Sequence, residues 1–304
     1  MTPTERALVF DCRGEPLLGV LSEPAQVGES GVIVIVGGPQ YRAGSHRQFV
    51  LLARALANAG HAVLRFDYRG MGDSGGEARS FEAVGDDIAA AVAALRSQLP
   101  QLRRITLWGL CDGASAALLY CHERRDHGLA GLCLLNPWVR SEASLARTQV
   151  RHYYLQRLMQ PAFWRKLLTG GVGAGALGEL ARSVSLSLRG GDAGDATARA
   201  VDAGPYPQRM AAAWQGFGGR ILLILSGNDY TAKEFIGVAA DDAAWRGALQ
   251  RPVVERQDVP EADHTFSDPA ARLRVEALTI AWLDAGGGVQ RAAPATSRLV
   301  PEVQ

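Results

Sequence analysis

Short apolar runs alternate with segments of helical periodicity along most of this chain. Four runs of strand length lie in the first half, at residues 31–38, 61–70, 104–110 and 129–139. Segments with apolar residues at helical spacing follow the first three runs, at 47–59, 81–98 and 113–125. Continuous Val, Ile and Leu runs are typical of strands buried on both faces. The alternation therefore predicts an α/β fold, with a mostly parallel sheet and helices on both of its faces.

The two ends of the chain complete this expected sheet. Residues 6–22 contain two alternating runs joined at Arg13-Gly14-Glu15-Pro16, a pattern typical of a β-hairpin. Apolar runs at 219–229 and 252–260, and a helical segment at 269–285, follow the central region. The hairpin's two strands, the four runs in the first half and these last two runs predict an eight-stranded sheet.

The alternation stops between residues 140 and 215. This region carries helical patterns, aromatic residues and a loose stretch rich in Gly, Ala and Asp. A chain of 304 residues is near the upper limit for one hydrophobic core. We therefore expect a single domain over residues 1–285 with a helical cap inserted at about 140–215, followed by a loose C-terminal tail at 286–304.

Charge and composition argue against several classes of partner. The chain has 32 basic and 31 acidic residues, which gives no reason to expect nucleic acid or an anionic membrane as partner. No apolar run reaches the roughly 18–20 residues of a membrane span, and the N-terminus lacks the pattern of a secretory signal. The four cysteines form no CxxC pair and no zinc-ligand spacing. We expect a cytoplasmic protein with reduced thiols, no metal and no organic cofactor. The oligomeric state does not follow from the sequence.

The segment LWGLCDGA, residues 107–114, is the strongest chemical signal. Small residues two positions before and two positions after a nucleophile are typical of a nucleophile elbow, because this tight strand-to-helix turn excludes larger side chains. Gly109 and Gly113 stand at those positions around Cys111. The N-terminus of the following helix favours a thiolate there. Taken alone, the pattern also fits a buried, inert cysteine.

Ser115 is the competing nucleophile, because small residues also flank it on both sides. It lies one turn into the expected helix, however, whereas the apolar strand ends at Leu110, immediately before Cys111. Position therefore favours the cysteine.

A second motif, FDYRGMGDSGG at residues 66–76, directly follows a strand. Its glycines allow sharp turns, and its Asp and Arg side chains can pair and brace the loop. We interpret this loop as scaffold near the active-site edge, with no catalytic role for Ser74.

The order of these motifs is similar to that of the α/β-hydrolase superfamily. A strand ending in GGP is followed by DYRGMGDSGG, LWGLCDGAS, LLILSGND and ADHTF, over roughly residues 6–285. More narrowly, GGPQYRAGSHRQF together with GLCDGAS resembles the exosortase A system-associated hydrolases (type 1), a bacterial family that accompanies exopolysaccharide and protein-sorting loci. In having a cysteine in the elbow, the chain also resembles dienelactone hydrolase, so a cysteine nucleophile has precedent in this fold.

The resemblance implies a Cys-His-Asp triad, in the chain order nucleophile, acid, histidine. Asp229 ends a strand and matches the acid position, although Gly-Asn-Asp is also favourable turn chemistry. His264, in ADHTF, matches the histidine position better than any other histidine of the chain, although a surface-loop histidine would look the same.

An oxyanion hole of two backbone N–H donors is also implied. One donor is Asp112, directly after the nucleophile. Gly38 is the expected second donor, because Gly37-Gly38-Pro39 aligns with the superfamily's His-Gly-x-Pro, and Gln40 is the alternative. The chain has Val36 where the superfamily has histidine. An Asp side chain pointing inward would raise the pKa of a neighbouring thiol. We therefore expect the Asp112 carboxylate to point away or to be held by a neighbouring donor.

Arg42, His46 and Arg47 follow the expected oxyanion loop. They are candidates for binding an anionic group of the substrate, or they simply line a solvated helix start. Trp138 and the aromatics of the cap are candidates for the wall of an acyl pocket, although such residues more often form the core of a cap.

The leading hypothesis is a hydrolase that cleaves an ester, thioester or lactone of a small-molecule acyl substrate through an acyl-enzyme on Cys111. The family resemblance associates it with exopolysaccharide or exosortase metabolism. Amide cleavage ranks lower, because a thiolate is less suited to expelling an amine. An acyltransferase would use the same acyl-enzyme with an acceptor other than water. The third alternative is a catalytically silent binding protein. Asp112 supports this alternative, because a carboxylate beside the nucleophile would disfavour the thiolate.

Overall fold

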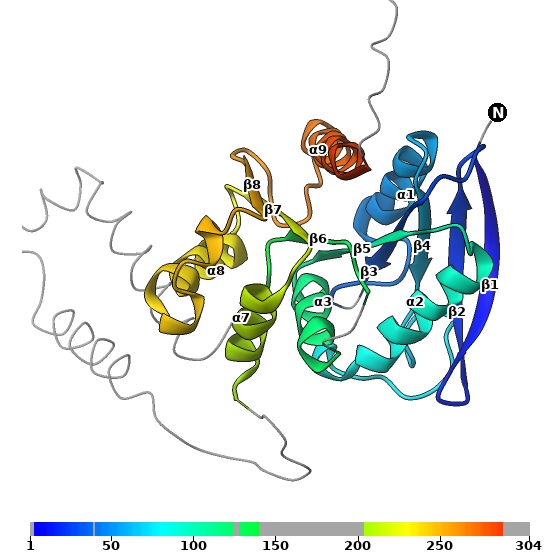
Figure 1. Cartoon of the computed structure of the whole chain (residues 1–304), viewed down its shortest axis with the longest axis horizontal. Coiled ribbons are helices and arrows are strands. Elements are labelled where there is room, and N and C mark those ends of the chain that lie inside the picture. Colours follow the sequence, from blue (N-terminus) through cyan, green and yellow to red (C-terminus); the bar gives the residue numbers. More distant parts are fainter. Residues whose placement is uncertain (1–2, 39, 125–127, 140–203, 288–304) are drawn as a thin grey trace, which may run out of the picture.

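The computed structural model describes residues 3–38, 40–124, 128–139 and 204–287. In this part of the chain an eight-stranded sheet forms the centre of the molecule, with strand order β1-β2-β4-β3-β5-β6-β7-β8 (Figure 1). The strands are β1 (Thr4–Cys12), β2 (Glu15–Glu23), β3 (Ser30–Ile35), β4 (Ala62–Phe66), β5 (Arg104–Leu110), β6 (Gly131–Leu135), β7 (Arg220–Ser226) and β8 (Val254–Val259). The predicted eight-stranded α/β fold is confirmed.

Six consecutive strands of the sheet, from β4 to β8, run parallel, as expected. The predicted hairpin is β1 and β2, and β2 joins the sheet antiparallel to β4. The strands β3, β4 and β6 are buried over their whole length. Side chains on both faces of these strands therefore pack against helices, which is why the sequence shows continuous apolar runs at these positions.

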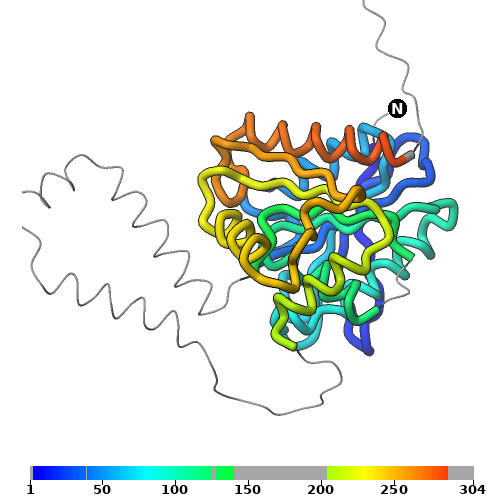
Figure 2. Tube along the Cα trace, turned by 60° about the vertical axis from the view of Figure 1, so that its left-hand side comes forward, coloured from blue at the N-terminus to red at the C-terminus, as the bar shows by residue number. Residues whose placement is uncertain are grey.

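Helices cover both faces of the sheet. They are α1 (Gln48–Asn58), α2 (Gly85–Gln98), α3 (Asp112–Glu123), α7 (Tyr206–Gly216), α8 (Tyr230–Asp241) and α9 (Pro269–Gly287). Short 3₁₀ turns are η1 (Ser45–Arg47), η2 (Phe81–Ala83), η3 (Ala243–Trp245) and η4 (Ala248–Gln250). Helices α1 and α9 pack together on one face, whereas α2, α3 and α7 pack side by side on the other (Figure 1). Figure 2 shows α9 running along the outside of the domain.

Helix α8 was not expected from the sequence. Its buried face consists largely of small residues around the fully buried Phe235. That ring packs against Trp214 of α7 and Trp245 of η3, with centroid separations of 5.9 and 5.3 Å. The apolar signal in the sequence is short, and the aromatic contacts that stabilise the helix come from outside it, from α7 and from η3, so tertiary packing decides this element.

The region predicted as a cap lies mostly outside the described residues. Residues 140–203 belong to that outside part, as do residues 288–304 of the predicted tail. The end of the predicted cap region forms α7, which packs against α3. Trp214 of α7 is fully buried, and its indole N–H donates to the carbonyl oxygen of Ala248.

The sequence motifs meet at one edge of the sheet. In parallel strands the carboxyl ends lie at the same edge, where open α/β sheets bind their ligands. Cys111 follows β5, Asn136 follows β6, Asp229 follows β7 and His264 follows β8. The loops after β3 and β4 also lie at this edge, and they carry Gly38 and the 67–76 motif.

None of the helices that the structure describes is both long enough and apolar enough to span a bilayer.

Candidate active site

Cys111 occupies the strained turn between β5 and α3. Its backbone has φ 60° and ψ −126°, a conformation that residues other than glycine rarely adopt. A Cβ atom at Gly109 would lie 2.6 Å from the carbonyl carbon of Gly113, and one at Gly113 would lie 2.5 Å from the carbonyl oxygen of Ile35. Both positions therefore require glycine. The turn places the Cys111 side chain at the N-terminus of α3.

The four cysteines of the chain are free thiols and differ in their surroundings. Cys12, Cys121 and Cys133 are buried, and burial raises the pKa of each thiol, to about 12 for Cys121. Cys111 is only partly buried. Among the four, it is the thiol that a substrate can reach.

Asp229 and His264 form a hydrogen-bonded pair beside Cys111. Nδ1 of His264 lies 2.9 Å from Oδ2 of Asp229. The carboxylate also caps α8, accepting the N–H groups of Thr231 at 3.0 Å and Ala232 at 3.2 Å. Burial opposes the ionisation of Asp229, but the hydrogen bond and charge of His264, together with these two N–H groups, lower its pKa below the ordinary value. The cap of α8 thus holds the carboxylate ionised and aimed at the histidine.

The hydrogen bond with Asp229, together with the interaction with the neighbouring Cys111 thiol, raises the pKa of His264 to about 10. Burial lowers this pKa, but it is outweighed. A protonated imidazole between a carboxylate and a sulfur is the arrangement that stabilises a thiolate.

Asn136, which was not among the residues predicted for the site, is connected to the same histidine. It is fully buried with φ 43° directly after β6. Its Nδ2 donates to the Ser226 hydroxyl at 2.8 Å and to the backbone oxygen of His264 at 3.1 Å, and its Oδ1 accepts the Ser226 N–H at 3.0 Å. The available signal was an Asn at the end of an apolar strand, because Asn tolerates left-handed backbone better than most residues.

The Asp112 carboxylate is held by a neighbouring donor, one of the two arrangements that we expected. Its Oδ1 accepts the backbone N–H of Gly38 at 2.5 Å. The same oxygen would lie 2.5 Å from a Cβ atom at Gly37, so the loop after β3 and the elbow are in close contact. The two expected oxyanion donors therefore lie together, and a carboxylate is already bound to one of them.

Gln40, the alternative donor, uses its side chain within its own loop. Its Oε1 accepts the Ser45 N–H at 3.2 Å and Nε2 of Gln48 at 3.4 Å. No hydrogen bond of the Gln40 backbone N–H to the elbow is seen among the described residues.

The expected substrate-binding residues have different surroundings. The guanidinium of Arg42 pairs with the buried Asp67 and, at 2.6 Å, with Asp73, so a substrate anion would compete with two carboxylates. His46 and Arg47 are exposed, and both have left-handed backbone, with φ of 52° and 60°. This strained pair links the oxyanion loop to α1.

Ser115, the competing nucleophile, serves a structural role. It is fully buried. Its hydroxyl donates to the Trp138 carbonyl oxygen at 2.6 Å and accepts the Trp138 N–H at 2.9 Å. The segment that carries the partly buried Trp138 is thereby fastened to the first turn of α3.

The 67–76 loop is braced by charged pairs, but Asp67 and Arg69 do not pair with each other. Asp67 pairs with Arg42, and Arg69 forms a two-pronged pair with the buried Asp87 of α2, at 3.0 and 2.7 Å. Ser74 donates to the Asp67 carbonyl oxygen and accepts the Leu18 N–H. These contacts fit the scaffold interpretation.

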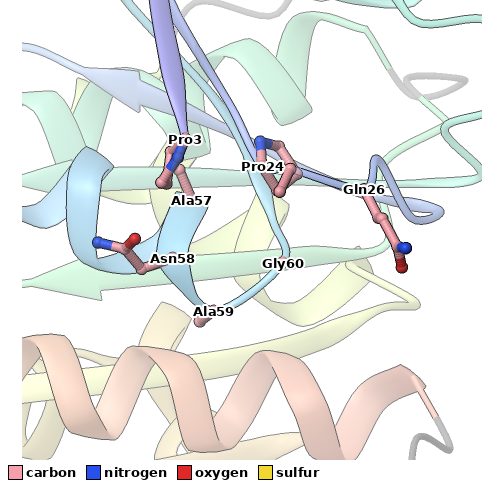
Figure 3. Close-up of a pocket in the computed structure, with 8 residues that line it drawn as sticks. Pro3, Pro24, Gln26, Ala57, Asn58, Ala59 and Gly60 are labelled. Atoms are coloured by element: carbon pink, nitrogen blue, oxygen red, sulfur yellow. The ribbon is translucent and has the colours of Figure 1, made fainter. Parts of the chain in front are cut away.

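A hollow of about 400 Å³ is lined by residues that include Pro3, Pro24, Asn58 and Gly60. Figure 3 shows how these residues lie around it. These residues lie where β1 and β4 begin and β2 ends, so the hollow is at the opposite edge of the sheet from Cys111. In the described ranges, no group of three His, Cys, Asp or Glu side chains is placed to hold a metal ion.

A tight strand-to-helix turn, a histidine and an acid that meet at the carboxyl edge of such a sheet are the arrangement typical of an α/β-hydrolase. The chain belongs to the hydrolase family described as "Serine aminopeptidase, S33", which it matches over residues 29–182, about half of its length. No curated protein sequence matches the chain.

Solved structures of several α/β-hydrolases have the same fold. The esterase Pf2001 of Pyrococcus furiosus superposes with a TM-score of 0.62 at 15% identity, covering 94% of this chain and 92% of the esterase. A dienelactone hydrolase of Anabaena variabilis gives a TM-score of 0.57 at 16% identity, covering 94% and 99% of the two chains. Est1E of Butyrivibrio proteoclasticus, solved with ferulic acid bound, gives 0.57 at 18% identity, covering 91% and 98%.

Proposed function

We propose that this chain is a cysteine-dependent hydrolase that cleaves an ester, thioester or lactone through an acyl-enzyme on Cys111. The observation that carries the proposal is the meeting of Cys111, in the strained turn after β5, with a His264 imidazole that is hydrogen-bonded to Asp229 and whose pKa the neighbouring Cys111 thiol raises. Each of the three side chains comes from a different loop at the carboxyl edge of the sheet. Such an arrangement supplies a nucleophile, a proton carrier and an orienting acid.

Acylation begins from the Cys111 thiolate and the His264 imidazolium. The sulfur attacks the acyl carbon, and the carbonyl oxygen becomes an oxyanion next to the N–H groups of Asp112 and Gly38. When the tetrahedral intermediate collapses, the bond to the leaving oxygen or sulfur breaks, and His264 gives its proton to that atom. The product is a thioester on Cys111.

Hydrolysis of the thioester restores the starting site. His264, now neutral, takes a proton from a water molecule as the water oxygen attacks the thioester carbon. Collapse of this second intermediate expels the Cys111 thiolate and releases the carboxylic acid. If an alcohol or another nucleophile replaces water at this step, the same residues perform acyl transfer.

The substrate class follows from the leaving group. Esters, thioesters and lactones release an oxygen or sulfur that is a better leaving group than an amine. The esterase and the dienelactone hydrolase among the similar structures support a substrate of this kind. The motifs GGPQYRAGSHRQF and GLCDGAS support the narrower assignment to exosortase A system-associated hydrolases, in exopolysaccharide or protein-sorting metabolism.

Labelling of the purified protein with iodoacetamide between about pH 5 and 9 tests the proposal. Mass spectrometry would locate the label in wild type, Cys111→Ala, Cys111→Ser and His264→Ala. We expect fast labelling confined to Cys111, persisting well below pH 8 and slowed by His264→Ala. Ser115→Ala is the matched control and should keep the label, because the Ser115 hydroxyl is hydrogen-bonded to backbone groups of Cys111 and Trp138 and not to the sulfur. Labelling of Cys111 at the rate of an ordinary thiol would contradict the proposal.

Once Cys111 is shown to be reactive, the purified protein would be assayed with aryl esters, acyl thioesters and lactones, each with and without an added alcohol as acyl acceptor. Free acid as the sole product identifies a hydrolase. An ester of the added acceptor identifies an acyltransferase.

A further inference from the structure

The contact between Asp112 and Gly38 affects the proposed chemistry directly. The N–H of Gly38 points at the Asp112 carboxylate, 2.5 Å from Oδ1. In the proposed reaction the same N–H binds the oxyanion of the substrate. A single N–H cannot serve both acceptors fully at once, and the two acceptors carry the same charge.

We propose that the Asp112 carboxylate is a built-in competitor for the oxyanion hole, which holds the Gly38 N–H in the resting protein and must release it before Cys111 is acylated. The proposal rests on the proposed function, because it concerns the acylation step. It assigns Asp112 two opposed roles. The backbone N–H of Asp112 stabilises the oxyanion, whereas its side chain delays the formation of that oxyanion.

The charges of the two competing acceptors decide when the Gly38 N–H leaves the Asp112 carboxylate for the substrate oxygen. A carboxylate is a stronger acceptor than the neutral carbonyl oxygen of a bound ester, so binding of the substrate alone leaves the Gly38 N–H with Asp112. The tetrahedral oxyanion is comparable in charge to the carboxylate and can replace it. The donor therefore acts mainly in the transition state, where its binding energy accelerates the reaction.

Protonation of Asp112 removes the competitor. A neutral carboxyl group is a weaker acceptor, so the Gly38 N–H becomes free. Burial raises the pKa of Asp112 above the ordinary value of an aspartate, although the N–H groups of Gly38, Asp112 and Gly113 and the charge of His264 oppose this shift. The protonated form is therefore populated at higher pH than for an exposed aspartate.

The ionisable groups around the carboxylate come from three elements. His264 faces it from the loop after β8, and Cys111 precedes it in the elbow. Tyr68, from the loop after β4, interacts with its charge and donates its hydroxyl to the Val36 carbonyl oxygen at 2.8 Å. Burial raises the pKa of Tyr68 well above the ordinary value, so this tyrosine stays neutral.

Two reactions of the same thiol separate the roles of Asp112. Alkylation by iodoacetamide consumes the Cys111 thiolate but forms no oxyanion, whereas acylation by p-nitrophenyl acetate needs the oxyanion hole. Both rates contain the thiolate fraction, so their ratio reports on the oxyanion hole alone. We expect Asp112→Ala to raise this ratio by about 10-fold, the effect of freeing one hydrogen bond from a charged acceptor. Asp112→Asn, whose amide oxygen is a neutral acceptor, should lie between Asp112→Ala and wild type.

The pH dependence of the same ratio in wild-type protein provides a second test. Between about pH 8 and 4.5, the ratio of acylation to alkylation should rise as the pH falls and Asp112 takes up its proton. In Asp112→Ala the ratio should not vary with pH. Glu29→Gln is the matched control, because it also removes one carboxylate, at the opposite end of β3, and it should behave as wild type.

Three outcomes would overturn the proposal. A lower ratio in Asp112→Ala would mean that the carboxylate braces the Gly38 donor. Equal changes in both rates would mean that Asp112 acts through the charge of the thiolate. An unreactive Cys111 in wild type and all variants would instead contradict the proposed function, and the role of Asp112 in acylation with it.

Discussion

The side-chain amide of Asn136 donates a hydrogen bond to the backbone oxygen of His264 at 3.1 Å, across the ends of β6 and β8. The same amide bonds the Ser226 hydroxyl and N–H at the end of β7. A single buried side chain therefore links the ends of three strands and fixes the backbone of the candidate catalytic histidine. We interpret Asn136 as a positioning residue that acts through His264.

Replacement of Asn136 should lower the reactivity of the Cys111 thiol indirectly, through His264. Asn136→Ala and Asn136→Gly both remove the amide, but only glycine accommodates the φ of 43° without strain. We expect both variants to lose about 1–3 kcal/mol of stability, because the polar groups left behind are buried. In both, alkylation of Cys111 should slow at neutral pH, and its pH profile should move to higher pH. A wild-type pH profile in Asn136→Gly would show that the residue serves only the turn.

His264 should remain protonated through neutral pH. Its hydrogen bond to Asp229 and its interaction with Cys111 raise its pKa to about 10, so NMR signals of its ring should titrate near that pH. Asp229→Asn should lower the midpoint, because the Asp229 hydrogen bond is the largest contribution. A midpoint near 6.5, the ordinary value of histidine, would contradict the pairing.

The same shift links pH to stability. His264 binds its proton more tightly in the folded chain than in the unfolded chain, so the pair stabilises the fold fully below about pH 6.5. This contribution is lost as the pH rises through the folded pKa of about 10. Thermal unfolding of wild type and His264→Gln should therefore differ most at low pH and converge near pH 10.

Gly37→Ala should disrupt the contact between the oxyanion loop and the elbow. A Cβ atom at this position would lie 2.3 Å from the carbonyl oxygen of Leu110 and 2.5 Å from Oδ1 of Asp112. We expect a loss of about 1–3 kcal/mol of stability and slower acylation by p-nitrophenyl acetate. Gly237→Ala in α8 is the control, because its added Cβ meets no atom within 4 Å. It should stabilise the helix by about 0.5–1 kcal/mol.

Removal of Asp87 should destabilise the protein strongly. The carboxylate is fully buried against Arg69, so Asp87→Ala leaves a buried, unpaired guanidinium and should cost about 3–5 kcal/mol in urea unfolding. Arg13→Ala breaks the exposed pair with Asp86 and should change the midpoint little. Similar losses in the two variants would contradict this role of the buried pair.

Local patterns were enough to predict the sheet and the elbow. The continuous apolar runs at β3, β5 and β6 follow from burial of these strands on both faces. Gly109 and Gly113 were expected at the elbow, because a turn of this shape has no space for a Cβ atom, and the structure shows the contacts that exclude one. Helix α8 was not predicted, because its packing partners Trp214 and Trp245 lie in other segments.

The sequence by itself determined the α/β fold, the order of the motifs along it and the position of Cys111 after the strand, since these depend on periodicity and residue size within short segments. The tertiary structure alone decided which side chains meet there. Asn136 reaches a backbone oxygen 128 residues away, and the Asp112 carboxylate binds an N–H 74 residues away. The direction of a side chain depends on the donors that folding brings within about 3 Å of it, and no spacing along the chain specifies those donors.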